Sequence, residues 1–491
     1  MSPSSLKVHS TALALLAALS VVAPAGAKVF VPTTTNDISD GSCDIDCSLR
    51  DAITAANQSP GFDAIVLNPG TYTLGIAAPA EDLNASGDLD VSDDLAILGG
   101  SAERTIIEGS NDRVFDVQAG TTVEIAGVTI RNGRLPSGGG DGAGIRNAGD
   151  LTLTRVAVTA NNASAGAGGG IFSSGASSSL TIAQSAITGN SAASAGGGIA
   201  VDGALTLTDS TISGNSAGTL GGGIYAFQNS DAEIVNVTIT GNHAANQAGG
   251  LYAASTPFQS TDRPVLRDTI LAGNTAAADP DCGGAPSSGG HNILGIGGTC
   301  IDFTAAKGDL VGTAAAPRDP KLGPLANNGG TTPTHALLAG SPAINAGASC
   351  TAVDQRGLAR SAAACDIGAF ELDATACLTG GPNLCLNEER FKVNVSFKTS
   401  QGQTGSGQAV QLTSDTGYFW FFDPSNVEVT IKVLNGCGFN QRYWVFLSGL
   451  TNVEVTVTVT DVVTGAAKTY TNPQGRTFRT VLDTSAFASC G

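Results

Sequence analysis

The sequence predicts an all-β protein. A right-handed parallel β-helix (solenoid) with a short N-terminal capping helix is followed by a C-terminal antiparallel β-sandwich. Three observations support this prediction. A repeat of roughly 25 residues, built from short strands and glycine turns, recurs through the centre of the chain. Its apolar residues alternate with period 2, which excludes a helical solenoid. Beyond residue 372 the composition changes, and both tryptophans lie there.

Four copies of the repeat align, and each ends in asparagine: LTLTRVAVTAN (151–161), LTIAQSAITGN (180–190), LTLTDSTISGN (205–215) and AEIVNVTITGN (232–242). Such short repeats cannot bury an apolar face alone, so neighbouring copies must stack, and strand twist makes the stack right-handed. Stacked strands lie about 4.8 Å apart. The aligned asparagines, with one more from a weaker fifth copy, should therefore form a ladder whose amides satisfy buried turn groups. Its members are Asn161, Asn190, Asn215, Asn242 and Asn274.

The composition and the N-terminus indicate a secreted protein. The chain has 491 residues and a formal net charge of −18, which argues against binding to nucleic acids or anionic membranes. Lys7 and His9 precede an apolar run, and Ala25-Gly26-Ala27 offers small residues for cleavage. We therefore expect residues 1–27 to be a signal peptide and no transmembrane segment to follow, in an extracellular or cell-surface protein.

The ten cysteines indicate disulfide bonds, because an even number of cysteines in a secreted chain suggests complete pairing. Zinc binding by the first two is disfavoured, since no second pair with zinc spacing follows. We expect three bonds that each close a local loop: Cys43–Cys47, Cys282–Cys300 and Cys350–Cys365. The last four cysteines allow three connectivities, of which we prefer Cys385–Cys437 with Cys377–Cys490.

Residues 28–58 should cover the N-terminal end of the β-helix, whose strand edges would otherwise be unpaired. They contain the sequence CSLRDAI (47–53), in which Ser48 and Asp51 form a capping box at the start of a short amphipathic helix. This motif resembles that of the secreted bacterial β-helix proteins named for Cys-Ser-Leu-Arg-Glu-Ala. Asp51 stands where that motif has glutamate and keeps the cap.

Residues 59–317 should form the β-helix, and residues 318–372 its last coils. The second segment contains NGGTTPTHAL (328–337), GSPAINAG (340–347), DQRG (354–357) and CDIGAFE (365–371). It resembles the choice-of-anchor Q region of the same secreted proteins. That resemblance implies that such proteins attach by varied C-terminal devices, and it implies no activity.

Residues 373–491 are predicted to form the β-sandwich. Strand-like runs at 391–398, 407–422, 427–434, 442–448, 453–461 and 467–471 are linked by Gly, Asn and Asp turns without a helical pattern. The run GYFWFFDP (417–424) is dense enough in aromatic residues to be a core strand. A similar tail occurs on many secreted bacterial proteins and implies no activity.

Two features of the β-helix could bind a ligand. The acidic group Asp88, Asp90, Asp93 and Asp94 has a calcium-like composition, but it lacks EF-hand spacing, and solvated strand faces also carry alternating aspartates. Hydroxyl residues recur two positions before the ladder asparagines and could form a flat row that binds sugar or ice. Threonine is also simply a good strand residue. The row is Thr159, Thr188, Ser213 and Thr240.

Catalysis is disfavoured in the central coils, residues 151–274. A lyase acting on an acidic polysaccharide needs a base and cationic charge, but lysine is absent from 29 to 306, and Lys and Arg are both absent from 156 to 262. A glycoside hydrolase needs two converging carboxylates, and the candidate pair in these coils, Asp202 and Asp209, flanks one strand without a second pair. The coil register indicates no catalytic partner for the three histidines of the mature chain, His243, His291 and His335.

The sequence therefore predicts a non-catalytic secreted or cell-surface protein without a cofactor, adhesin-like or binding a polysaccharide or a surface protein. The alternative is a carbohydrate-active enzyme, either a polysaccharide lyase or a glycoside hydrolase, built on the β-helix.

Overall fold

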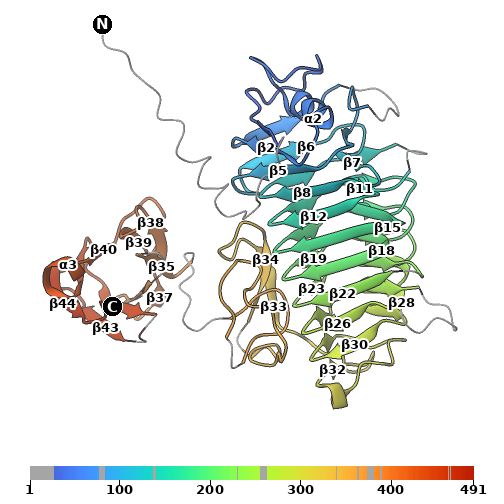
Figure 1. The fold of residues 1–491 in the computed structure, drawn as a ribbon. Helices are drawn as coiled ribbons and strands as arrows, with labels where there is room; N and C mark the ends of the chain where they lie inside the picture. Colours follow the sequence, from blue (N-terminus) through green and yellow to red (C-terminus); the bar gives the residue numbers. More distant parts are fainter. Residues whose placement is uncertain are drawn as a thin grey trace, which may run out of the picture. The chain divides into compact units, whose positions relative to one another are not determined.

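The computed structural model divides into two compact units, residues 1–372 and 373–491, which are described separately (Figure 1). The predicted signal peptide, apart from its last residue, and Cys377 lie outside the described residues. The described residues are 27–76, 83–136, 140–228, 230–254, 263–338, 340–361, 364–372, 381–387, 390–462, 464 and 466–490.

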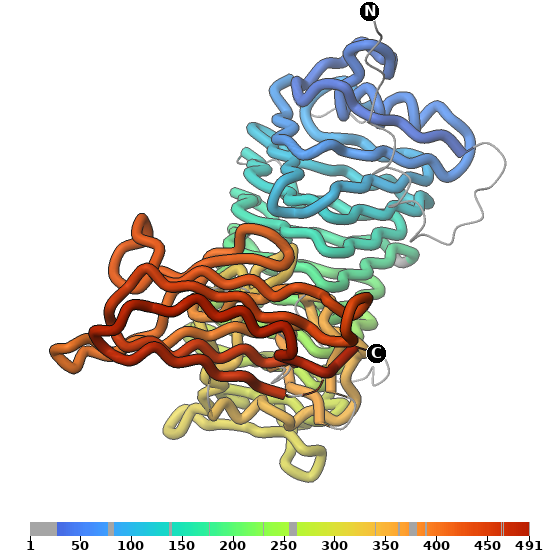
Figure 2. The backbone as a smooth tube through the Cα atoms, turned by 90° about the vertical axis from the view of Figure 1, so that its left-hand side faces the viewer, coloured from blue at the N-terminus to red at the C-terminus, as the bar shows by residue number. Residues whose placement is uncertain are grey.

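The first unit is a parallel β-helix in which successive coils stack in chain order from the N-terminal to the C-terminal end (Figure 2). Sheet A contains β1 (Val29–Phe30), β2 (Asp63–Leu67), β4 (Leu89–Val91), β5 (Leu95–Gly99), β7 (Phe115–Val117), β8 (Thr122–Ala126), β11 (Ile145–Asn147), β12 (Asp150–Thr154), β15 (Ile171–Ala183), β18 (Ile199–Thr208), β21 (Ile224–Ala226), β22 (Asp231–Val235), β25 (Leu251–Ala253), β26 (Val265–Arg267), β29 (Cys282–Gly284) and β30 (Ser287–Gly290).

Two further sheets complete the coils, and the second of them, sheet C, is confined to the middle coils. Sheet B contains β3 (Gly70–Thr73), β6 (Thr105–Glu108), β9 (Thr129–Arg131), β13 (Ala157–Thr159), β16 (Ala186–Thr188), β19 (Thr211–Ser213), β23 (Thr238–Thr240), β27 (Ile270–Leu271), β31 (Ile293–Leu294) and β32 (Leu310–Val311). Sheet C contains β10 (Arg134–Leu135), β14 (Asn162–Ala163), β17 (Ser191–Ala192), β20 (Ser216–Ala217), β24 (His243–Gln247) and β28 (Thr275–Ala278).

Apolar residues at equivalent positions stack inside the coils and form the core. One column on sheet A runs in register through five fully buried side chains: Leu153, Ile182, Leu207, Ile234 and Leu266. Burial of each such side chain contributes about 1.5–3 kcal/mol. Because the alternation has period 2, the neighbouring positions face outward and are available for other roles.

Each coil turns its corners at residues in the left-handed conformation. The corner between sheets A and B falls at the same position of each repeat, and the corner between sheets B and C one position before the ladder asparagine. The first set is Arg155, Gln184, Asp209, Asn236 and Asp268, and the second is Ala160, Gly189, Gly214, Gly241 and Gly273. Glycine adopts this conformation most readily, which explains the glycine before the ladder asparagine in four of the five copies.

The asparagine ladder is present at the corner between sheets B and C. Asn190 Nδ2 donates to Asn215 Oδ1 at 3.0 Å and to Val158 O at 2.9 Å, and the Asn190 N–H donates to the same Asn215 oxygen at 3.0 Å. The pattern repeats from Asn161 to Asn274, and all five side chains are buried. The ladder ends at Asp281, whose Oδ1 accepts from Asn274 N and Nδ2. Burial raises the pKa of the Asp281 carboxyl.

The helix α2 (Leu49–Asn57) covers the N-terminal end, and its capping box of Ser48 and Asp51 is formed. Its Arg50 is fully buried, donating to Asp37 Oδ1 and to the carbonyls of Gly87 and Asp88, each at 2.8 Å. At the other end the last coils carry the 3-10 helix η1 (Ala305–Lys307) and β32.

The prediction that residues 318–372 form further coils is wrong. This segment, which we call the strap, contains the antiparallel hairpin β33 (Leu322–Ala326) and β34 (Thr334–Leu337) in a separate sheet. It runs back along the outer face of sheet B (Figure 1), where Gln355 Oε1 accepts from Thr211 Oγ1 at 2.6 Å and the Ala369 N–H donates to Thr238 Oγ1 at 3.0 Å. Prolines 317, 320, 324, 333 and 342 cannot donate to a parallel ladder, which is why stacking ends before them.

The second unit consists of two antiparallel sheets, as predicted for a sandwich. One contains β35 (Asn383–Leu386), β36 (Phe391–Lys398), β37 (Thr404–Ser406), β42 (Glu454–Asp461) and β43 (Ala467–Asn472). The other contains β38 (Gln408–Gln411), β39 (Thr416–Trp420), β40 (Val429–Asn435), β41 (Tyr443–Gly449) and β44 (Val481–Phe487), with the short helix α3 (Cys437–Asn440). Their inner faces enclose a separate apolar core.

The three local disulfides Cys43–Cys47, Cys282–Cys300 and Cys350–Cys365 are present. In the second unit the preferred pairing is wrong, because Cys437 bonds to Cys490. The reason is topological: β41 pairs with β44, so the chain end reaches α3, whereas Cys385 lies in the other sheet, where it is disulfide-bonded.

Candidate functional site

A patch of aromatic side chains lies on the outer face of sheet A, over β15, β18, β21 and β25. The strand register places outward residues of successive coils directly above one another, in the order Asp116, Arg146, Phe172, Ala200, Tyr225 and Tyr252. Phe227 lies two residues beyond Tyr225 on the same face. We call Phe172, Tyr225, Phe227 and Tyr252 the aromatic patch, and all four are half-buried.

The rings of the aromatic patch hold one another in place. Tyr225 and Tyr252 stack with centroids 5.7 Å apart and planes 7° apart. Phe227 packs edge to face against both Tyr225 and Phe172. The ring centroids are 4.7 Å apart in the first pair and 6.4 Å apart in the second. Burial and the neighbouring Tyr252 raise the pKa of Tyr225, so its phenol stays a neutral hydrogen-bond donor. Ala200, which lies between Phe172 and Tyr225 in this column, is fully buried.

Asp202 is the acidic residue beside the aromatic patch. It follows Ala200 by two positions on β18 and pairs with Ser174, so its side chain faces outward while Val201 is buried in the core. The N–H of Phe227 bonds to Val201 O, which puts Phe227 on the neighbouring coil next to Asp202. The half-exposed Asp202 carboxylate can therefore accept hydrogen bonds from a ligand lying on the rings.

Asp209 does not lie beside Asp202, so it does not add a second carboxylate to the aromatic patch. It follows the end of β18, seven residues on, and an extended strand rises about 3.3 Å per residue. Asp209 is buried, accepts from Thr351 Oγ1 at 2.5 Å and forms an ion pair with Arg360 of the strap at 3.0 Å. Burial raises the pKa of Asp209 against the opposing effect of Arg360. Its role is to hold the strap on the β-helix.

The strap also covers much of the predicted row of hydroxyl groups. Thr188 and Ser213 are buried, and Thr188 Oγ1 donates to Thr159 Oγ1 at 3.2 Å. Ser213 Oγ lies 2.9 Å from His335 Nε2, and His335 Nδ1 lies 2.8 Å from Gly323 O. Since Nδ1 must donate to that carbonyl, Nε2 accepts from the serine. A serine and histidine so placed can form a nucleophilic pair, but Ser213 is only 6% exposed and lies beneath the strap.

Each of the other two histidines forms a hydrogen bond through its ring Nδ1. His243 Nδ1 lies 3.0 Å from Thr275 Oγ1 on the exposed face of sheet C, and His291 Nδ1 lies 3.0 Å from Ala346 O of the strap. Burial lowers the pKa of His335, which keeps its ring neutral. Within the part of the chain that the structure describes, no histidine is hydrogen-bonded to a carboxylate.

The acidic group near the N-terminal end is a buried cluster of Asp88, Asp90 and Asp116. Asp93, which the calcium interpretation included, bonds instead to the N–H of Asp94. Burial and the Asp90 carboxylate raise the pKa of Asp88 to about 8, against the effect of Arg113, which contacts it at 2.6 Å.

Two arginines neutralise this buried cluster. Besides Arg113, Arg146 contacts Asp116 Oδ2 at 2.7 Å. The guanidinium groups of Arg113 and Arg146 therefore offset part of the negative charge of this cluster.

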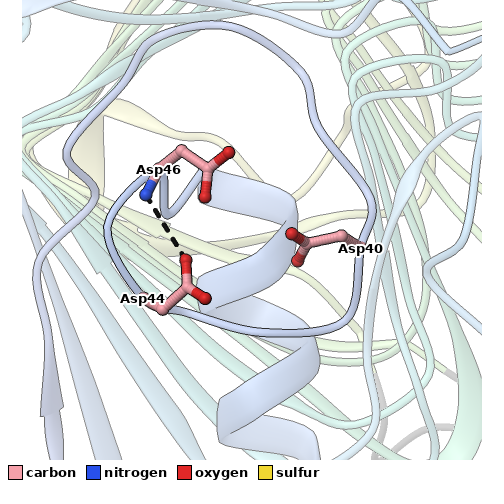
Figure 3. A group of neighbouring side chains, drawn as sticks. All are labelled: Asp40, Asp44 and Asp46. Atoms are coloured by element: carbon pink, nitrogen blue, oxygen red, sulfur yellow. Dashed lines mark hydrogen bonds between the residues drawn. The ribbon is translucent and has the colours of Figure 1, made fainter.

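A second acidic cluster, not anticipated from the sequence, lies in and beside the Cys43–Cys47 loop. Asp40, Asp44 and Asp46 converge there, and all three are exposed (Figure 3). The Asp46 N–H donates to Asp44 Oδ1 at 3.4 Å, and the Asp44 side chain raises the pKa of Asp46. Exposed carboxylates of this kind are solvated, and nothing else in the loop indicates a ligand.

The aromatic patch was not predicted from the sequence, although a signal was present. The patch residues Phe172, Tyr225 and Tyr252 each follow directly after a Gly-Gly-Ile or Gly-Gly-Leu turn, and Ala200 occupies the same position. Because those turns are aligned by the repeat, the residues after them had to form one column.

The family described as "Right handed beta helix region" matches residues 95–261 and 141–294. These ranges contain the whole aromatic patch and the asparagine ladder. No curated protein matches the chain. No solved structure matches it either. Among the described residues, no helix is long and apolar enough to cross a membrane.

Proposed function

We propose that this right-handed β-helix protein is a non-catalytic, secreted or cell-surface protein that binds a neutral polysaccharide on sheet A. The observation that carries this proposal is the aromatic patch with Asp202 beside it. Right-handed β-helices serve both enzymes and binding proteins, so the fold alone does not decide the function.

The chemistry of the patch suits a sugar polymer. Aromatic rings offer flat apolar faces to the C–H side of a pyranose ring, and Asp202 and the tyrosine hydroxyls provide an acceptor and donors for sugar hydroxyl groups. The rings of Tyr225 and Tyr252 come from successive coils, so the patch extends along the helix axis and suits an elongated chain.

The charge distribution favours a neutral polymer. The coils from residue 156 to 262 contain no lysine or arginine, while Asp202, Asp231 and Glu233 lie in them. An acidic polysaccharide would meet mainly negative charge there, since Arg146 lies at the edge of the patch and Arg267 is already paired with Glu233.

Asp209 lies too far along β18 from Asp202 to act as its partner acid, which supports binding rather than hydrolysis. Two carboxyl groups of a glycosidase lie about 5–10 Å apart, whereas Asp209 is at the far end of β18 and paired with Arg360. Secretion is supported by the disulfides, which form in oxidising compartments, and by the N-terminal sequence.

The test is affinity electrophoresis of the full mature chain in gels containing cellulose derivatives, xylan, mannan or polygalacturonate. We expect retardation by a neutral polymer, and a loss of at least about tenfold in affinity for Tyr225→Ala with Tyr252→Ala, since aromatic anchors dominate binding energy. His243→Ala, on the exposed face of sheet C, is the matched control and should bind like the wild type. Retardation that is as strong in the double variant as in the wild type would contradict the proposal.

A cleavage assay separates binding from catalysis. The same polymers are incubated with the full chain, and reducing ends and unsaturated products are measured. We expect no product with either the wild type or Asp202→Asn. Product formation that disappears in Asp202→Asn would show that the patch belongs to an active site.

A further inference from the structure

One end of the β-sandwich is formed by three connections that lie together. They are residues 421–428 between β39 and β40, residues 450–453 between β41 and β42, and residues 473–480 between β43 and β44. The strand register brings them to the same end, since Val429 pairs with Gly449 and Val455 pairs with Asn472. Loops gathered at one end of a sandwich are a common position for ligand binding.

Backbone hydrogen bonds fix these loops to one another. The Leu450 N–H donates to Glu428 O at 2.7 Å, and the Gly475 N–H donates to Asn452 O at 2.9 Å. The ring of Phe478 packs directly on Gly449, where a Cβ atom would come within 2.2 Å of it. The third loop therefore folds over the end of β41, and the arrangement is formed in advance of any ligand.

The loops line a cavity of about 700 Å³ that is open to solvent, and we call it the loop-end cavity. Phe422 is 52% exposed and Leu450 is 74% exposed at its edge, while Phe478 is buried in its wall. A large apolar side chain that remains exposed next to a cavity has a face available for a ligand.

The polar groups of the loop-end cavity complement these rings. Glu428 is only 5% exposed, and its one side-chain hydrogen bond comes from Asn426 Nδ2 to Oε1 at 2.6 Å. Neither Glu428 nor the exposed Arg476 forms an ion pair among the described residues. A buried carboxylate without a cation is costly unless it gains further hydrogen bonds.

We infer that the loop-end cavity is a second binding site, which takes one or two sugar rings of a neutral oligosaccharide. Phe422 provides the stacking face, Glu428 accepts hydrogen bonds from a pair of sugar hydroxyls, and Arg476 and Asn452 donate to others. Hydroxyl groups suit this lining because they both donate and accept, so a neutral sugar satisfies the carboxylate and the guanidinium together. The inference is independent of the aromatic patch on sheet A.

The experiment is isothermal titration of the full mature chain with cellohexaose, xylohexaose, mannohexaose and hexagalacturonate. The variants are Phe422→Ala and Glu428→Gln, and circular dichroism checks that each is folded. Phe439→Ala is the matched control, because Phe439 is 86% exposed but lies in α3 at the opposite end of the sandwich. Tyr225→Ala with Tyr252→Ala removes the aromatic patch and isolates the cavity.

We expect at least one neutral hexasaccharide to bind, and its affinity to fall about tenfold or more in both cavity variants. The Phe439→Ala and aromatic-patch variants should retain that binding. The inference is overturned if no neutral member binds, if only hexagalacturonate binds, or if folded Phe422→Ala and Glu428→Gln bind like the wild type. Binding lost only with the aromatic patch would overturn it while supporting the site on sheet A.

Discussion

Replacing Asn215 by leucine tests how far the asparagine ladder stabilises the β-helix. The Asn215 side chain makes four hydrogen bonds: it accepts from Asn190 N and Nδ2, and it donates to Ile187 O and Asn242 Oδ1. Leucine has a similar size but makes none of them. Asn242 Oδ1 keeps the bond from the Asn215 N–H, and Asn190 Nδ2 keeps its bond to Val158 O.

The Asn190 N–H is then left buried with no acceptor, and such a group costs about 1–3 kcal/mol, in addition to about 1 kcal/mol for each other bond lost. We therefore expect the free energy of unfolding of the β-helix to fall by roughly 4–6 kcal/mol. Asn162→Leu is the matched control, since Asn162 is exposed on sheet C and adjacent to the ladder.

The assay uses urea denaturation followed by two signals. Both tryptophans lie in the sandwich, so tryptophan fluorescence reports the second unit, whereas far-ultraviolet circular dichroism also reports the β-helix. Asn215→Leu should lower the midpoint of the dichroism transition and leave the fluorescence transition unchanged. The reasoning is refuted if the dichroism midpoint falls no further than in Asn162→Leu.

Two further predictions concern buried charges. Arg360→Met should release the strap, because it leaves the buried carboxylates of Asp209 and Glu371 without their cation at a cost of about 3–5 kcal/mol. Limited proteolysis should then cut the strap faster than in Arg267→Met, whose ion pair is half-exposed, and equal rates would contradict this role. Asp88 has a folded pKa of about 8, above its ordinary 3.8, so the folded state holds the proton more tightly and stability falls as pH rises between these values. In Asp88→Asn the loss in free energy of unfolding between pH 5 and pH 8.5, measured by urea denaturation, should be smaller by on the order of 1–3 kcal/mol, and identical losses would count against it.

The features predicted correctly from the sequence are those that the repeat imposes. Asn190, Asn215 and Asn242 recur at one position with glycine before them, so parallel stacking alone brings them together. The capping helix was predictable because Ser48 and Asp51 are close in sequence and their interaction is local.

The features that escaped prediction depend on contacts between distant, non-repeating segments. The strap has no periodic pattern, and its attachment through Arg360 to Asp209 spans 151 residues. The pairing of Cys437 with Cys490 depends on the order of strands in the second sheet, which the sequence does not encode locally. The loop-end cavity likewise requires three connections to meet, which only the folded sandwich reveals.

The strap has a mechanical consequence when tension is applied to the C-terminal end of the β-helix. A solenoid loaded at its last coil can unravel one coil at a time, because each coil contacts only its neighbours. Here the chain leaves the β-helix at Leu372, just after Glu371, which is joined through Arg360 to Asp209 in the middle of the stack. The strap also bonds to Asn236 and Asp268 on the following coils. Tension applied through the C-terminal unit is therefore shared among several coils at once, and the last coil, which ends at β32, is not the point of load.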